Sequence, residues 1–239
     1  MITHRCKQGS PQWHALRLGR PTASLFSKII TPAKGELSKQ ADPLAYELAA
    51  ERILGYSRDD VSTKAMQTGR ENEPLARAWY EMAHECEVEQ VGICFTDDGR
   101  VGASPDGIVG AGLLEIKCPT PPVHVGYLLG NFGVEGDYKC QVQGQLWVCE
   151  REWLDTVSYC PPFVVAERCV YRDEEFIAKL SNAVREFADK VDDFERRLIA
   201  MGCEPLKRDE VQPERDSTLH MTDEEAAGFA QALWQGRAQ

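Results

Sequence analysis

The hydrophobic pattern of the chain changes its period near residue 87, and this change restricts the fold more than any other feature. Before it, apolar residues recur with the spacing of amphipathic helices. After it, residues 87–96 alternate in the manner of a strand, and residues 113–116 form a short apolar run that is also typical of a strand. The segments 87–96, 101–104 and 112–119 are separated by the turn sequences Asp-Asp-Gly-Arg and Pro-Asp-Gly. The stretch therefore predicts a β-meander that follows a helical region.

Helical and strand segments lie on both sides of the meander and set the fold class. Helices are predicted over 10–19, 22–30, 42–54, 63–84, 137–149 and 174–201, and two further strands over 153–160 and 163–172. We expect N-caps at Ser10, Asp42 and Asp173, and a new helical segment beginning just before Pro74. The Pro- and Gly-rich connection 119–136 is expected to be a functional loop. This order fits an α/β domain with a central mixed sheet flanked by helices.

Length and composition indicate a cytoplasmic protein with one main domain. The 239 residues predict a single domain over 1–203 and a polar tail over 204–239 that carries a short amphipathic helix. No apolar run approaches the roughly 20 residues of a membrane-spanning helix, and the first residues lack the apolar core of a signal peptide. Nine cysteines without a Cys-x-x-Cys pair fit free thiols in a reducing compartment.

Charge is distributed unevenly along the chain. The net charge of −11 argues against a generally basic nucleic-acid-binding protein. Residues 1–60 nevertheless carry 9 Lys and Arg against 6 Asp and Glu, a balance of +3. The balance is −8 in residues 61–170 (8 against 16) and −6 in residues 171–239 (10 against 16). If a polyanion binds, we expect most of its contacts to come from the first 60 residues.

The meander contains a pattern of two acids and one lysine that suits metal-assisted hydrolysis. Glu115 and Lys117 are two residues apart on a strand and therefore share a face, and the Pro-Asp-Gly turn can bring Asp106 beside them. Carboxylates, with the carbonyl of Ile116, are ligands suited to Mg²⁺ or Mn²⁺. Lys117 then either deprotonates the attacking water or only orients it, and the sequence leaves this open. The competing interpretation is a surface ion pair on a strand.

Several motifs in a fixed order resemble a known nuclease family. Ser-Pro-Asp-Gly at 104–107 and Leu-Glu-Ile-Lys-Cys-Pro at 114–119 are similar to motifs of the PD-(D/E)xK nuclease superfamily. Similar motifs of the phage lambda exonuclease, or YqaJ-type viral recombinase, family match residues 13–24, 69–77 and 138–148. The resemblance covers about residues 10–150 and points to a prophage-encoded alkaline exonuclease with a restriction-endonuclease-like core.

The resemblance implies an activity and partners that composition and periodicity do not reveal. It implies a 5′→3′ exodeoxyribonuclease that digests one strand of linear double-stranded DNA, releases 5′-mononucleotides and leaves a 3′ single strand. It further implies dependence on Mg²⁺, with Mn²⁺ able to substitute and two ions at the site. The implied assembly is a homotrimeric ring around DNA, and the implied partner is a single-strand annealing recombinase. The host compartment would be the bacterial cytoplasm.

The resemblance also assigns roles to individual residues. Asp106, Glu115 and the Ile116 carbonyl match metal ligands, and Lys117 matches the catalytic lysine. Two helical residues complete the catalytic set, namely Glu73, which supports the metal or its water, and Gln141, which closes the site. Residues expected to bind DNA or its phosphates are Arg17, Ser24 and Lys34, with Trp13, Ser104 and Tyr138 as further candidates. Lys34 stands in the loop where the family holds the 5′-phosphate, but lysine lacks the bidentate fork of arginine.

Several of these residues also fit a purely structural role, and other functions compete with the exonuclease assignment. Trp13 also fits a core position, Tyr138 fits packing, and Arg17 fits a surface ion pair. Tyr138, Gln141 and Gln145 recur every three to four residues and can share one helix face. Within the superfamily, the alternatives are an endonuclease or a single-strand exonuclease of the Cas4 type, whose iron–sulfur cysteine cluster is absent from the sequence. An inactive DNA-end-binding module is the alternative from a different class.

Overall fold

The computed structural model describes residues 1–57, 64–133, 136 and 138–206. The chain divides into a unit spanning Met1–Pro205 and a second unit spanning Leu206–Gln239. The helix predicted in the tail lies outside the described residues. Within the described part, none of the helices combines the length and the apolar composition that crossing a bilayer requires.

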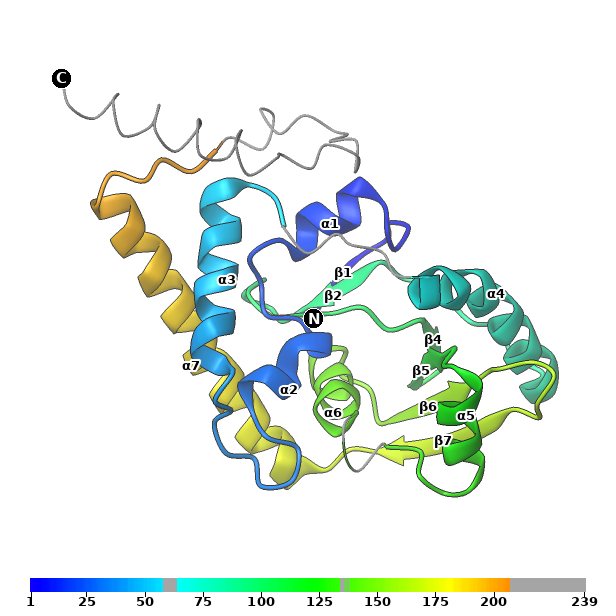
Figure 1. Cartoon of the computed structure of the whole chain (residues 1–239). Coiled ribbons are helices and arrows are strands. Elements are labelled where there is room, and N and C mark those ends of the chain that lie inside the picture. Colours follow the sequence, from blue (N-terminus) through cyan, green and yellow to red (C-terminus); the bar gives the residue numbers. More distant parts are fainter. Residues whose placement is uncertain (58–63, 134–135, 137, 207–239) are drawn as a thin grey trace. The chain divides into compact units, whose positions relative to one another are not determined.

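The first unit begins with a short strand, continues with a run of helices and then a run of strands, and ends on a long helix, with two helices between the fourth and fifth strands of the later part (Figure 1). The helices are α1 (Pro11–Arg17), the 3₁₀ helix η1 (Ala23–Leu25), α2 (Phe26–Ile29), α3 (Ala41–Leu54), α4 (Lys64–His84), α5 (Pro121–Leu128), α6 (Lys139–Val148) and α7 (Glu174–Ala200). The strands are β1 (Ile2–His4), β2 (Ile93–Phe95), β3 (Gly102–Ala103), β4 (Gly107–Val109), β5 (Gly112–Lys117), β6 (Trp153–Ser158) and β7 (Ala166–Tyr171).

A four-stranded mixed sheet forms the centre of the unit, which confirms the predicted fold class. Its strand order is β4-β5-β6-β7, with β5 and β6 parallel and the other pairs antiparallel. The predicted meander is divided between two sheets, because β2 and β3 pair with β1 in a separate antiparallel sheet. The tight turn of the β4–β5 hairpin lies at Gly110, where φ is +55°, and not at the predicted Pro-Asp-Gly sequence.

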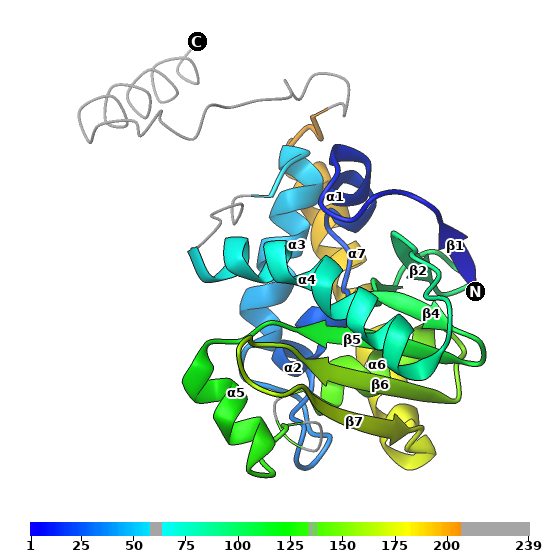
Figure 2. The same cartoon turned by 90° about the vertical axis from the view of Figure 1, so that its right-hand side faces the viewer.

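Helices cover the two faces of this sheet with different partners. Leu113 belongs to the cluster shared with α6, whereas Leu114 and Ile116 belong to the cluster shared with α4. Figure 2 shows α4 in front of β5, with α6 behind the sheet. The Tyr80 hydroxyl of α4 donates a 2.7 Å hydrogen bond to buried Asp155 of β6 and attaches the helix to the sheet. Since side chains alternate along β5, Glu115 and Lys117 point toward α6.

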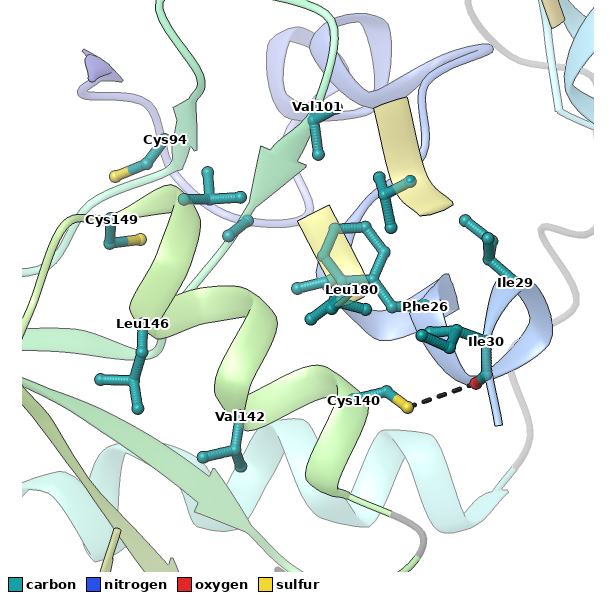
Figure 3. Close-up of a cluster of buried hydrophobic side chains, with 14 of the residues drawn as sticks. Phe26, Ile29, Ile30, Cys94, Val101, Cys140, Val142, Leu146, Cys149 and Leu180 are labelled. Carbon is teal, nitrogen blue, oxygen red and sulfur yellow. Dashed lines mark hydrogen bonds between the residues drawn. The ribbon is translucent and has the colours of Figure 1, made fainter. Parts of the chain in front are cut away.

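Helix α6 is held in place by the main core on its other side (Figure 3). Phe26 and Ile30 of the α2 segment pack there with Leu180 of α7, and the Cys140 thiol donates to the carbonyl of Ile30 at 3.4 Å. A Cβ at Gly144 would lie 2.4 Å from the ring of Phe26, so only glycine permits this approach. The core therefore fixes the helix whose polar face meets β5.

Two of the expected helix caps are confirmed and one is wrong. The Ser10 hydroxyl accepts from the Trp13 N–H at 3.3 Å, and Asp173 accepts from the Phe176 N–H at 3.0 Å. Helix α3, however, begins at Ala41 after an N-cap at Gln40, so Asp42 lies inside its first turn. A carboxylate there still interacts favourably with the helix dipole, although it makes no cap.

Three further expectations require correction, and one strand was not predicted. Helix α4 runs unbroken through Gly69 and Pro74, because burial of Tyr80 and Ala76 on its second half offsets the cost of the proline. The expected loop 119–136 contains helix α5, which begins at Pro121, a residue suited to the first helical turn. The helix expected over 22–30 divides into η1 and α2. Strand β1 escaped prediction because three residues are too few to show a period.

Candidate active site

Asp106 occupies an open edge of strand β5, next to the end of the hairpin. Its backbone N–H donates to the carbonyl of Leu114 at 3.0 Å, as the last bond between the two strands. Its carboxylate then accepts from the N–H of Ile116 at 2.6 Å, in place of a backbone partner. Because the N–H and C=O of one strand residue point to the same edge, the Ile116 carbonyl also faces this side. Asp106 and that carbonyl are thus brought together at one edge.

Glu115 is the most enclosed carboxylate of the site and has partners at both oxygens. It is 4% exposed. Its Oε1 accepts hydrogen bonds from Lys117 Nζ and from Gln141 Nε2, both at 2.6 Å. Its Oε2 accepts from Gln145 Nε2 at 2.7 Å. Strand β5 and helix α6 therefore meet at this one carboxylate.

Lys117 lies between the acids and a tyrosine ring. Its ammonium group also donates to Gln141 Oε1 at 3.2 Å and lies 4.8 Å from the ring centroid of Tyr138. The Tyr138 hydroxyl is hydrogen-bonded to that of Tyr127 at 2.8 Å, so the ring is fixed under the lysine. Burial lowers the pKa of Lys117, but the carboxylates of Glu115 and Asp106 outweigh it, and the pKa lies above its usual value. The lysine is therefore a cation in this arrangement.

The acids of the site repel one another. Burial raises the pKa of Asp106 well above its usual value, and the nearby charges of Glu115 and Glu73 raise it further. Glu73 projects from α4 and is paired with Arg77 through a 2.5 Å contact one helical turn away. It therefore acts on the site through its charge, while its own carboxylate is held by an arginine.

The donor set at β5 fits a divalent cation that prefers oxygen ligands. Two carboxylates, of Asp106 and Glu115, converge with the carbonyl of Ile116, and such hard oxygen donors are those that Mg²⁺ and Mn²⁺ take. The raised pKa of Asp106 marks negative charge concentrated in a desolvated space, which a cation would relieve. Within the described ranges, no cluster of three or more His, Cys, Asp or Glu side chains forms a ready cage. The remaining ligands would be water and substrate.

A second group of polar side chains connects the N-terminal segment with the residues just before Asp106. Arg17 donates to the hydroxyls of Ser104 at 3.4 Å and Ser24 at 3.2 Å, and its guanidinium lies 4.3 Å from the ring centroid of Trp13. The indole of Trp13 in turn donates to Ser104 at 3.0 Å. Burial lowers the pKa of Arg17 to about 10, partly offset by Glu51, so the group still carries its charge near neutral pH. A desolvated cation among hydroxyls is suited to a phosphate.

The remaining candidate, Lys34, does not join this group. It is exposed in the loop between α2 and α3. Among the residues that the structure describes, no hydrogen bond or ion pair links it to the site. The structure therefore brings together four of the six DNA-binding candidates, Trp13, Arg17, Ser24 and Ser104, and places Tyr138 beside Lys117 among the candidate catalytic residues.

One residue of the site received no role from the sequence. Gln145 contacts Glu115 directly, yet the sequence shows only that it can share a helix face with Gln141. The i, i+4 spacing of these two glutamines was the available signal. This spacing indicates a contact with Glu115 only because α6 lies on the Glu115 side of the sheet.

Comparison with known proteins decides the family. The family model of the YqaJ-like viral recombinase domain matches residues 12–152 of the sequence. The chain belongs to the YqaJ-like viral recombinase family. The match to this YqaJ model contains every candidate site residue, from Trp13 to Gln145, and confirms the family resemblance found in the motifs.

Solved structures of exonucleases share the fold of this YqaJ-family chain. An alkaline exonuclease (LHK-Exo) from Laribacter hongkongensis is 32% identical, with a TM-score of 0.72 over 80% of this chain and 97% of that chain. The same enzyme in complex with dAMP, also 32% identical, gives a TM-score of 0.71 and covers 80% of this chain and 98% of that chain. A phage-related exonuclease from Haemophilus somnus 129PT is 16% identical and gives a TM-score of 0.60 over 76% of this chain and 96% of that chain. At this identity the match supports the fold alone. No match exists among the curated proteins.

Proposed function

We propose that this YqaJ-family chain is a metal-dependent DNA exonuclease. It digests one strand of linear double-stranded DNA in the 5′→3′ direction, releases 5′-mononucleotides and leaves a 3′ single strand for recombination by strand annealing. The observation that carries the proposal is the gathering of Asp106, Glu115, Lys117 and Gln141 around the end of β5, with Asp106 at its open edge and the other three on its α6 face. Family membership and the 32% identical alkaline exonuclease support the nuclease class.

The reaction breaks one P–O bond and makes another. Water attacks the phosphorus, its oxygen becomes part of the 5′-phosphate of the shortened strand, and the 3′-oxygen of the released nucleotide leaves and gains a proton. Arg17, with Ser24 and Ser104, supplies N–H and O–H donors that hold a phosphate beside Asp106. The complex of the Laribacter enzyme with dAMP supports a mononucleotide as the product.

Lys117 and Gln141 position the attacking water. The Lys117 ammonium group is fixed between Glu115, Gln141 and the Tyr138 ring, so its remaining N–H donor has one direction in which to point. Gln141 lies one helical turn from Gln145 and closes the other side of Glu115. Such fixed donors lower the reorganisation that a reaction needs when charge develops.

In this proposal Asp106, Glu115 and the Ile116 carbonyl would hold Mg²⁺, Mn²⁺ could substitute for it, and two ions are expected at the site. When bound, the metal neutralises the phosphate charge and stabilises the leaving oxygen. Glu73 is placed to adjust the charge around these ligands, because its carboxylate already raises the pKa of Asp106. Its pairing with Arg77 favours this supporting role over direct ligation.

The uneven charge supports a ring-shaped homotrimer that works on DNA ends in the bacterial cytoplasm beside a single-strand annealing recombinase. The net charge is −11, yet residues 1–60 carry +3. A ring that turns the N-terminal segments toward its channel would present Arg17 to DNA and keep the acidic segments outside. Lys34 would then receive the 5′-phosphate from its exposed loop as a point charge.

A linear duplex labelled separately at each end, with and without a 5′-phosphate, tests the function. We expect Mg²⁺-dependent release of mononucleotides from 5′ ends, no loss of supercoiled circles, and a loss of about 100-fold or more in rate for Asp106→Asn and Lys117→Ala. Lys34→Ala should reduce only the preference for a 5′-phosphate. Cleavage of supercoiled circles would indicate an endonuclease, and end binding without turnover at any divalent metal would indicate an inactive binding module.

A further inference from the structure

Gln145 is a fully buried amide whose donor is directed at the most enclosed carboxylate of the site. It is 1% exposed, and its Nε2 donates to Oε2 of Glu115 at 2.7 Å. The other carboxylate oxygen, Oε1, is taken by Lys117 and Gln141. Without Gln145, therefore, one oxygen of Glu115 would lose its only described side-chain partner and the carboxylate could rotate about its last bond.

The acceptor of the same amide shows that the contact is not made for packing. Gln145 Oε1 is buried, and no group in the described part of the chain donates to it. Thr156 Oγ1 is likewise buried without a partner in the described part, and Thr156 pairs in register with Glu115 on the adjacent parallel strand. Its side chain therefore shares the α6 face of the sheet with Glu115. An apolar side chain of the same volume would fill this place without leaving an unpaired acceptor.

Because the Gln145 amide is uncharged, it can orient Glu115 without neutralising it. A second lysine or arginine on Oε2 would neutralise Glu115 and compete with a cation, whereas an amide orients the oxygen and leaves its charge available. Groups that hydrogen-bond a metal-ligating carboxylate in this way fix its orientation and tune the affinity of the metal. Gln145 has the position, the burial and the charge for such a role.

We propose that Gln145 is a positioning residue that holds the Glu115 carboxylate in the orientation that a divalent cation requires. The inference rests on the proposed function, because it assigns Glu115 to a metal. It differs from the role of Gln141, which contacts both Glu115 and the lysine. Among the described residues, the Gln145 side chain hydrogen-bonds only to Glu115, so it acts on metal binding and not on the water that Lys117 positions.

Helix α6 provides a matched control two residues away. Gln143 is 3% exposed, but it donates to the carbonyl of Tyr171 and accepts from the N–H of Asp173, both at 2.9 Å. Gln143→Met therefore removes a buried amide of the same size from the same helix without touching Glu115. It should lower stability while leaving metal affinity unchanged.

The test is calorimetric titration of the DNA-free full-length protein with Mn²⁺, alongside KM for linear duplex DNA, kcat and the unfolding temperature. Gln145→Met should weaken Mn²⁺ binding about tenfold, the lower end of the usual effect of such partners. The KM for DNA should stay constant, and a higher Mn²⁺ concentration should restore kcat. Gln143→Met should bind Mn²⁺ like the unaltered protein.

Several results would overturn the inference. Equal Mn²⁺ affinity in Gln145→Met and the unaltered protein would do so, as would an unaltered protein that binds no Mn²⁺. If Gln145→Met fails to fold, Gln145→Asn keeps the amide but shortens its reach, and the same loss of affinity is expected. An unaltered protein that binds Mn²⁺ but leaves linear duplex DNA intact would contradict the proposed function alone, since the Mn²⁺ titration still decides the role of Gln145.

Discussion

At the scale of single residues, Arg17 is the side chain whose surroundings most clearly favour binding of an anion. It is a desolvated cation that, among the described residues, contacts two hydroxyls and an indole ring and forms no salt bridge. Burying a positive charge costs free energy unless an anion pairs with it. A phosphate that binds Arg17 would relieve this cost, and the relief would add to the binding free energy. The bland alternative of a surface ion pair does not describe these contacts.

We expect Arg17→Ala to lower kcat/KM for linear duplex DNA by about 10- to 100-fold, because hydrogen bonds to charged groups contribute roughly 1.5–3 kcal/mol. Arg17→Lys should recover only part of this, since lysine keeps the charge but lacks the planar fork. Arg196→Ala is the matched control, because Arg196 is exposed on α7 and paired with Asp193. Steady-state kinetics at fixed salt measure the effect, and equal losses for Arg17→Ala and Arg196→Ala would disprove a specific contact.

The sequence could predict the site residues that obey a local period, and not those defined by contacts between distant elements. The alternation along β5 placed Glu115 and Lys117 on one face, and the motif placed Asp106 near them. The hydrogen bond from Gln145 to Glu115 joins residues 30 positions apart. No pattern within one helix could show which of its glutamines would reach that acid.

At the scale of secondary-structure elements, α7 and α6 are joined through the N-cap of α7. Asp173 accepts from the Phe176 N–H at 3.0 Å and pairs with Lys139, the first residue of α6, at 3.1 Å. Gln143 of α6 in turn accepts from the N–H of Asp173. The start of the longest described helix is thus attached to the helix that carries Gln141 and Gln145.

Asp173→Ala should destabilise the protein by about 1 kcal/mol at neutral pH through loss of this cap. The Phe176 N–H, followed by Lys139, keeps the pKa of Asp173 below its usual value. The stabilisation is therefore present above the unfolded-state pKa of about 3.9 and is lost as the pH falls through the lower folded-state value. Urea unfolding of both proteins from pH 7 to pH 3 should show the difference shrinking below about pH 4.

The exposed position Glu186 on the same helix supplies the control for the cap. Glu186→Ala should change the unfolding free energy by no more than about 0.5 kcal/mol, as is usual for surface substitutions. A pH-independent effect of Asp173→Ala would mean that the charge of the carboxylate contributes nothing and that another contact explains the loss.

Elements with a strong period were predictable, whereas those decided by tertiary packing were not. The long apolar stripe of α7, which includes Phe176, Leu180 and Val184, identified that helix and its cap. Pro74 misled the prediction for α4, because the burial of Tyr80 against the sheet lies outside any local signal. Helix α5 was missed because its prolines and glycines resemble a loop, although two prolines in the first turn are compatible with a helix.

At the scale of the whole molecule, the charge balance constrains how DNA reaches the site. A chain with a net charge of −11 does not attract DNA over its whole surface, so binding depends on a local concentration of positive charge. Residues 1–60, which hold Arg17 and Lys34, supply the only positive balance among the three segments compared. Bringing several copies of this segment together would multiply the attraction without changing the acidic remainder.

This reasoning leads to the prediction for the assembly. We expect light scattering to give three times the mass of one chain at working concentrations, since a closed ring is what would keep an acidic enzyme on its strand. Digestion started on labelled linear duplex should then continue after an excess of unlabelled duplex is added, because a ring cannot leave DNA sideways. Asp106→Asn should form the same trimer, as Asp106 lies in the site and the ring does not depend on catalysis. A monomeric mass, or immediate arrest by the competitor, would disprove the ring while leaving the nuclease site unaffected.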